Sequence, residues 1–217
     1  MTTRRLTICS ILSGLFILSC AAVGPETQQR LIRIKVLADV SFRARNPDWQ
    51  REARALIEAA SDYYEREFDI RLVTQSVLPW PEKERVPSTP ELLARLKKDF
   101  AVTAKSGDYD LIVALTAERV SRVLTAGRPR VDRIGDCAQG LANYVIVPTT
   151  AVFRYHGPNA EPEFDELALI HEIGHVFGAV HVEDQNSLMN EEFGYRTEFD
   201  SKNRATIQKN KFCAFAK

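Results

Sequence analysis

Apolar and polar side chains alternate along several short segments of the chain, and these segments predict its strands. Residues 32–36 alternate aliphatic and basic side chains, as a half-buried β-strand does. Residues 69–78 also have the character of a strand, and the nearly continuous apolar run over 109–115 is typical of a buried central strand. Residues 144–147 are a further predicted strand.

Between and after these strands, apolar residues recur at helical spacing. An Asn-Pro-Asp sequence at 46–48 places a capping residue and a proline where a long helix begins. Ser88 and Glu91 fit a capping box at the start of a second helix, and a final helix is predicted at about 200–211. Strands that alternate with helices, followed by a mostly helical end, predict one α/β domain over residues 31–217.

The beginning of the chain has a different pattern. Two arginines precede an apolar run over residues 6–18, which is the arrangement of a signal peptide and is too short to span a bilayer as a mature helix. Residues 1–19 are therefore predicted to be a signal peptide, and residues 20–30 a short polar tether. The mature protein is expected to be exported.

The end of this apolar run resembles the lipobox of bacterial lipoproteins. Leu18 lies two residues before Cys20, an aliphatic residue lies three before it, and the small Ser19 directly precedes it. The resemblance implies that Cys20 carries lipid, so that the protein contacts a membrane through this anchor only, facing the periplasm or the cell surface. Leu18 is bulkier than is usual at its position, and ordinary secretion with cleavage near Ala21 is the alternative.

Composition and charge narrow the function classes. The chain is 27% charged and 45% hydrophobic, which is typical of one soluble globular domain. Lys+Arg and Asp+Glu each number 29, so the formal net charge is zero. A nucleic-acid binder normally shows an excess of basic residues, so we exclude that role. We also expect the protein to be a monomer.

Export also changes how the four cysteines are interpreted. Cys9 is lost with the signal peptide and Cys20 is the lipidation site, which leaves Cys137 and Cys213. Two remaining cysteines in an oxidising compartment predict a disulfide bond that ties the C-terminal region to the domain. The alternative, a thiolate ligand in a metal site, is disfavoured because neither cysteine stands at ligand spacing from the histidines.

The candidate chemistry lies in a predicted apolar helix that begins near residue 164. His171 and His175 are four residues apart, so both imidazoles project from one helix face and can reach the same zinc ion. Glu172 is next to the first histidine. Its carboxylate is therefore placed beside the metal, where it can accept a proton from water.

A third histidine follows after a predicted turn. Gly178 stands where a helix can end in a left-handed turn, which would bring His181 back towards the first two histidines. Three protein ligands leave a coordination position open for water, which is the mark of a catalytic zinc site.

The sequence HEIGHVFGAVH fits H-E-x-x-H-x-x-G-x-x-H and resembles the metzincin metalloproteases. Met189, eight residues after the third histidine, resembles the methionine turn beneath the zinc in that family, and the spacing is similar to that of the matrixins. The resemblance implies a zincin-like α/β (α+β) fold with a twisted mixed sheet. It also implies a Zn²⁺ endopeptidase that acts on proteins or peptides, with Glu172 as general base. A peptide substrate would pair with an edge strand, for which residues 142–147 are the candidate.

The chain also departs from the family pattern. Some metzincins carry a tyrosine two residues after the methionine, and Glu191 stands there in this chain. Tyr195 is the nearest tyrosine, with a surface or pocket-wall role favoured over a role at the metal. Val182, which follows the third histidine, matches no subfamily.

Two other functions remain open at this point. The first is an exported binding protein that keeps zinc for stability and cleaves nothing, although the presence of Glu172 disfavours it. The second is a zinc-dependent amidase that acts on cell-wall peptides, which an exported protein would meet.

Overall fold

The computed structural model describes residues 28–81, 89–102, 107–117, 130–192 and 194–216. The predicted signal peptide, Cys20, most of the tether and Ser88 lie outside these residues. Among the described residues, no helix is both long enough and apolar enough to cross a membrane.

A four-stranded sheet forms the middle of the domain, and its strands follow the predicted segments closely. They are β1 (Arg30–Ala38), β2 (Ile70–Pro79), β3 (Leu111–Thr116) and β4 (Tyr144–Pro148), in the order β2-β1-β3-β4. Neighbouring strands all pair in parallel. Antiparallel pairing to a named strand is confined, in the described chain, to an isolated bridge between Val131 and Val145.

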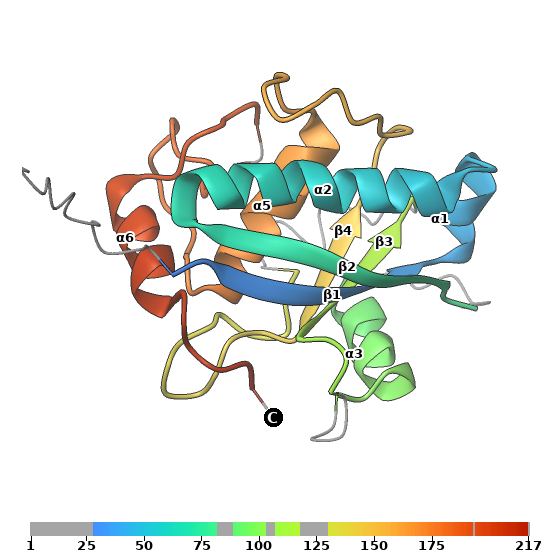
Figure 1. Cartoon of the computed structure of the whole chain (residues 1–217), viewed down its shortest axis with the longest axis horizontal. Helices are drawn as coiled ribbons and strands as arrows, with labels where there is room; N and C mark the ends of the chain where they lie inside the picture. The colour runs from blue at the N-terminus through green and yellow to red at the C-terminus, as the bar shows by residue number, and fades with distance from the viewer. Residues whose placement is uncertain (1–27, 82–88, 103–106, 118–129, 193, 217) are drawn as a thin grey trace, which may run out of the picture.

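Helices cover both faces of this sheet (Figure 1). The long helix α2 (Trp49–Phe68) and helix α5 (Phe164–Val176) lie on one face, and α3 (Thr89–Asp99) lies on the other. Alternate residues of β3 serve the two layers: Val113 packs in the larger core with α2 and α5, whereas Ile112 packs in the smaller core with α3. Both faces of the central strands are buried, which explains their continuous apolar character.

Two shorter helices are also present among the described residues. Helix α1 (Val40–Arg45) follows β1 directly, and its cap Asp39 accepts a hydrogen bond from the N–H of Phe42 at 2.7 Å. Helix α1 was not predicted from the sequence, because six residues give too short a periodic signal. Helix α6 (Ser201–Asn210) lies at one end of the domain, beyond α5, as Figure 1 shows.

The outer edge of β4 is not open along its length, which corrects the expected substrate edge at residues 142–147. The N–H of Ile146 donates to the carbonyl of Arg130 at 2.9 Å, and the N–H of Asp132 donates to the carbonyl of Tyr144 at 3.3 Å. Residues 130–132 thus use the hydrogen-bonding groups on which an added peptide would depend. A three-residue bridge is too short to show alternation in the sequence.

Candidate metal centre

Helix α5 carries two of the three candidate ligands. Its first turn contains Asp165 and Glu166, whose negative charge is favourable at the positive end of a helix. Apolar residues surround the helix on nearly all sides, so that His171 is only 6% exposed and His175 is fully buried. The four-residue spacing places both imidazoles on the same face, as the sequence predicts.

The turn after α5 brings the third histidine to the other two. The helix ends at Val176, and Gly178 has a φ of +96°, in the left-handed region that glycine adopts without strain. A Cβ atom at this position would lie 2.5 Å from the carbonyl oxygen of Gly135, so there is also no room for a side chain. The predicted turn at this glycine is therefore present, and it returns the chain to place His181 opposite α5.

The three imidazoles converge on one point. The Nε2 atoms of His171 and His175 are 3.2 Å apart, and His181 Nε2 lies 3.2 Å from the former and 3.1 Å from the latter. A tetrahedral ion with metal–nitrogen bonds of about 2.0–2.1 Å needs separations of about 3.3–3.4 Å between its ligands. The triangle formed by the three Nε2 atoms is thus the right size to hold a metal ion, and the three histidines form a possible metal-binding group.

The hydrogen bonds of the Nδ1 atoms determine the tautomer of two of these histidines, and therefore which ring nitrogen presents a lone pair to the centre. His171 Nδ1 lies 2.8 Å from the carbonyl oxygen of Leu188, and His175 Nδ1 lies 2.7 Å from that of Ala179. A carbonyl only accepts hydrogen bonds, so each Nδ1 carries the proton and each Nε2 a lone pair. Burial lowers the pKa of both imidazoles to about 4, which keeps them neutral at pH 7. Converging neutral lone pairs fit a cation.

Glu172 is another buried ionisable residue of this helix, with 2% of its surface exposed. Its Oε2 accepts the main-chain N–H of Arg130 at 2.8 Å, and its Oε1 lies 3.3 Å from the Arg130 guanidinium. Burial raises the pKa of this carboxyl, while the positive charge of Arg130 opposes the increase. The contact with Arg130 was not predicted, because no spacing rule links two residues that are 42 positions apart.

Met189, the residue predicted to form a methionine turn, packs against helix α5. It is fully buried, and its N–H donates to Ser187 Oγ at 3.1 Å. A Cβ on Gly174 would lie 3.1 Å from Met189 Sδ and 2.9 Å from the ring of Phe199. Glycine at position 174 therefore lets the sulfur approach the helix backbone between the two histidines.

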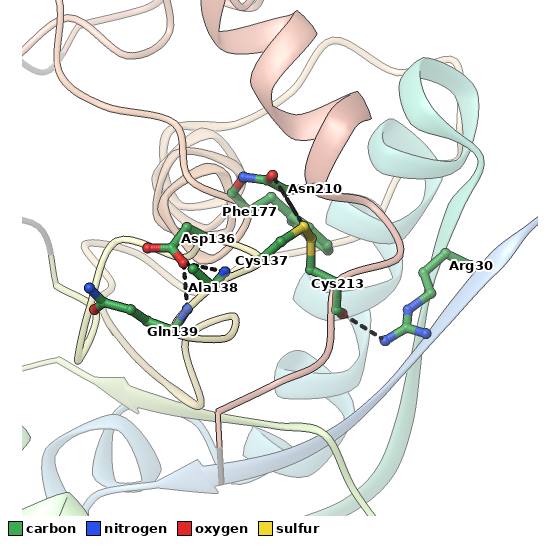
Figure 2. The surroundings of a disulfide bond; sticks show 8 residues. All are labelled: Arg30, Asp136, Cys137, Ala138, Gln139, Phe177, Asn210 and Cys213. Atoms are coloured by element: carbon green, nitrogen blue, oxygen red, sulfur yellow. Dashed lines mark hydrogen bonds between the residues drawn. A yellow bond between two sulfur atoms is a disulfide. The ribbon is translucent and has the colours of Figure 1, made fainter.

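A disulfide bond between Cys137 and Cys213 closes this end of the domain (Figure 2). Both sulfur atoms contact Asn210 Oδ1, at 3.7 and 3.9 Å. Asn210 Nδ2 donates to the carbonyl of Phe177 at 2.9 Å, so the amide lies between the disulfide and the end of α5. Cys137 and Cys213 are thus bonded to each other, so neither of them supplies a thiolate ligand to the metal site.

Comparison with known families decides which class of protein carries this centre. The family model for metallo-peptidase family M12 matches residues 28–214. The chain belongs to metallo-peptidase family M12. No curated protein is similar enough to the chain to count as a match. The M12 family has a metzincin-type zincin fold, so the fold predicted from the histidine motif is confirmed. The finer likeness to the matrixins stays a prediction.

The remaining candidate residues of the M12 peptidase lie at the surface. Tyr195 is 47% exposed, and its ring stacks edge-on against Phe164, two helical turns before His171. His156 is exposed and lies 3.5 Å from a carboxylate oxygen of Glu163. Neither residue belongs to the group of three converging histidines.

Proposed function

We propose that this M12 peptidase is a zinc-dependent endopeptidase of the metzincin type. The observation that carries the proposal is the convergence of three Nε2 atoms within 3.2 Å of one another, two of them on a helix that also presents a buried carboxylate. His171, His175 and His181 would hold the ion. Bound there, zinc would supply a Lewis acid that makes water more acidic and polarises a peptide carbonyl.

Glu172 acts as the general base in this proposal. Arg130 engages both carboxylate oxygens, through its main-chain N–H and its guanidinium, and thereby limits rotation of the carboxylate. One oxygen accepts a proton from the attacking water and then delivers it to the leaving amine nitrogen. The burial of Glu172 supports this role, because a carboxylate with a raised pKa accepts a proton more readily.

Residues 130–132 are the proposed binding edge for a peptide substrate. Their inner side pairs with β4, and Arg130 contacts Glu172. A peptide that pairs with the outer side of this segment would therefore pass close to the catalytic carboxylate. Strand addition of this kind binds the peptide backbone and leaves pockets to select side chains.

The function is tested by peptide-library digestion with wild type and Glu172→Ala, each with and without a chelator, alongside metal analysis. Wild type is expected to cleave, to stop when chelated and to recover with Zn²⁺. Glu172→Ala should keep its metal and lose about 10²–10⁴-fold in rate, as expected for loss of general acid–base catalysis. Wild-type rates in the variant would contradict the mechanism. Cleavage of muropeptides but not proteins would indicate the amidase, and bound metal without any cleavage the binding protein.

We further propose that the protein is exported and anchored by lipid on Cys20. The disulfide between Cys137 and Cys213 supports export, since such bonds persist in oxidising compartments. Labelled fatty acid should enter the wild type in bacterial cells and not Cys20→Ala. An unlabelled wild-type protein, found free in the medium, would show secretion without an anchor.

A further inference from the structure

The third ligand of the proposed metal site is held differently from the first two. His171 and His175 are fixed by the regular geometry of α5, whereas His181 lies outside any helix or strand. Its position therefore depends on what holds the backbone on either side of it. On the C-terminal side, Val182 N–H donates to the carbonyl of Met189 at 3.1 Å, and Asn190 Nδ2 donates to the carbonyl of Val182 at 3.1 Å.

On the N-terminal side, one side chain holds Val180, the residue before the ligand. Asn203 Oδ1 accepts the N–H of Val180 at 2.9 Å, and Asn203 Nδ2 donates to the carbonyl of Val180 at 2.9 Å. The amide thus pairs with both backbone groups of one residue, as a neighbouring strand would. Asn203 is 1% exposed, while the side chain of Val180 is largely outside the core, so apolar packing does not replace this contact.

The same amide is fixed by the cap of α6. Asp200 accepts the N–H of Asn203 at 3.0 Å and its Nδ2 at 2.7 Å. The Asp200 carboxylate also accepts the hydroxyl of Ser187 at 2.7 Å, and that hydroxyl accepts the N–H of Met189. The start of α6 therefore contacts the turn that carries His181 and the methionine turn together.

The far end of α6 holds the beginning of the same turn. Asn210 stands seven residues after Asn203, on the same helix face, and donates to the carbonyl of Phe177. We infer that α6 acts as a clamp on the segment 177–181 and that Asn203 is the positioning residue for the third metal ligand. This inference rests on the proposed metal site, and it adds a determinant of metal affinity that touches neither metal nor substrate.

The inference is tested by measuring Zn²⁺ and Co²⁺ affinity of the full chain in competition with a chelator. Asn203→Ala is expected to bind both ions about 10–100-fold more weakly, because residues that orient ligands carry effects of this size. The absorption bands of the Co²⁺ protein should shift as well, since they report ligand geometry. The Asn203→Ser variant keeps one hydrogen-bonding side-chain atom, so its metal affinity should lie between those of wild type and Asn203→Ala. It replaces the alanine variant in the test if that variant fails to fold.

Ile207→Ala is the matched control. Ile207 is fully buried on the same face of α6, one turn after Asn203, but its side chain has no polar atom to hold the turn. The Ile207→Ala substitution should lower the melting temperature of the metal-free protein, while the metal affinity stays within about threefold of that of wild type. Equal affinity in Asn203→Ala and wild type, or an equal loss in Ile207→Ala, would overturn the inference and leave the proposed function intact. A wild-type chain that binds no metal would overturn both.

Discussion

The two sides of the candidate metal centre are built by different kinds of contact. Helix α5 is surrounded by apolar side chains, and its histidines follow from helix geometry. The turn that carries His181 is held by directional hydrogen bonds from side chains of α6 and from neighbouring loops. Apolar packing is non-directional, whereas a hydrogen bond weakens when its distance or angle leaves a limited range. We therefore expect changes on the turn side to be the more damaging.

The largest expected change in stability comes from removing the disulfide, which lies beside the turn. Replacing both Cys137 and Cys213 by serine should lower the free energy of unfolding by about 4 kcal/mol, because the bond closes a loop of 76 residues. Urea unfolding measures the change. A reducing agent should destabilise wild type by a similar amount and leave the double variant unaffected. A loss below about 1 kcal/mol would show that the turn is held without the bond.

The same substitution on each side of the centre gives a direct comparison. Gly178→Ala should cost about 2–3 kcal/mol, since alanine is strained at a φ of +96° and its Cβ would lie 2.5 Å from a carbonyl oxygen. Gly174→Ala should cost less, about 0–2 kcal/mol, because a gain in helix propensity of about 1 kcal/mol offsets part of the cost of crowding against Met189 and Phe199. Thermal unfolding of the two variants measures which of them loses more stability. The reverse ranking would contradict the contrast between helix and turn.

Acid should weaken the helix side in a defined range of pH. Burial lowers the pKa of His171 and His175 to about 4, against about 6.5 in an unfolded chain. At these two histidines the unfolded state therefore binds more protons between these values, so they make the metal-free protein less stable as the pH falls from about 6.5 to about 4. The raised pKa values of Glu166, about 7, and of Glu172 act in the opposite direction over part of this range, so the contribution of the histidines is measured as a difference between variants. The loss is up to about 1.4 kcal/mol per pH unit for each histidine.

Urea unfolding of the metal-free protein at a series of pH values measures this slope. His156→Gln is the control, because that side chain is 61% exposed and contacts only a surface carboxylate among the described residues. The control should leave the slope unchanged. His175→Gln removes one of the two buried imidazoles and should lose less stability than wild type as the pH falls over this range. Equal slopes in wild type and His175→Gln would mean that burial does not hold this imidazole neutral.

Spacing along the chain predicts the helix side of the centre well, and it also predicts the turn that follows the helix. The four-residue interval between two histidines, the glycine three residues later and the apolar helix are all local patterns, and the structure has each of them. The strands were predicted for the same reason, since alternation is visible within five to ten residues. The long helix α2 begins at Trp49, close to the predicted cap.

The long-range contacts that hold the turn and the carboxylate could not be predicted in the same way. Asn203 contacts Val180 across 23 residues, and Arg130 contacts Glu172 across 42. An asparagine in a polar helix such as α6 gives no sign that its amide is buried, and an arginine in a polar loop gives no sign that it meets a carboxylate. Contacts of this kind depend on how separate elements pack, so they became visible only in the folded chain.

The position of α6 in the sequence has a consequence for the order in which the protein is made. The histidines, Glu172 and Met189 all lie between the two bonded cysteines, and α6 and Cys213 follow them. A chain that leaves the ribosome from its N-terminus therefore presents every ligand before the helix that holds the third one. If α6 holds the third proposed ligand as inferred above, the centre can be completed only after the chain has emerged as far as Cys213.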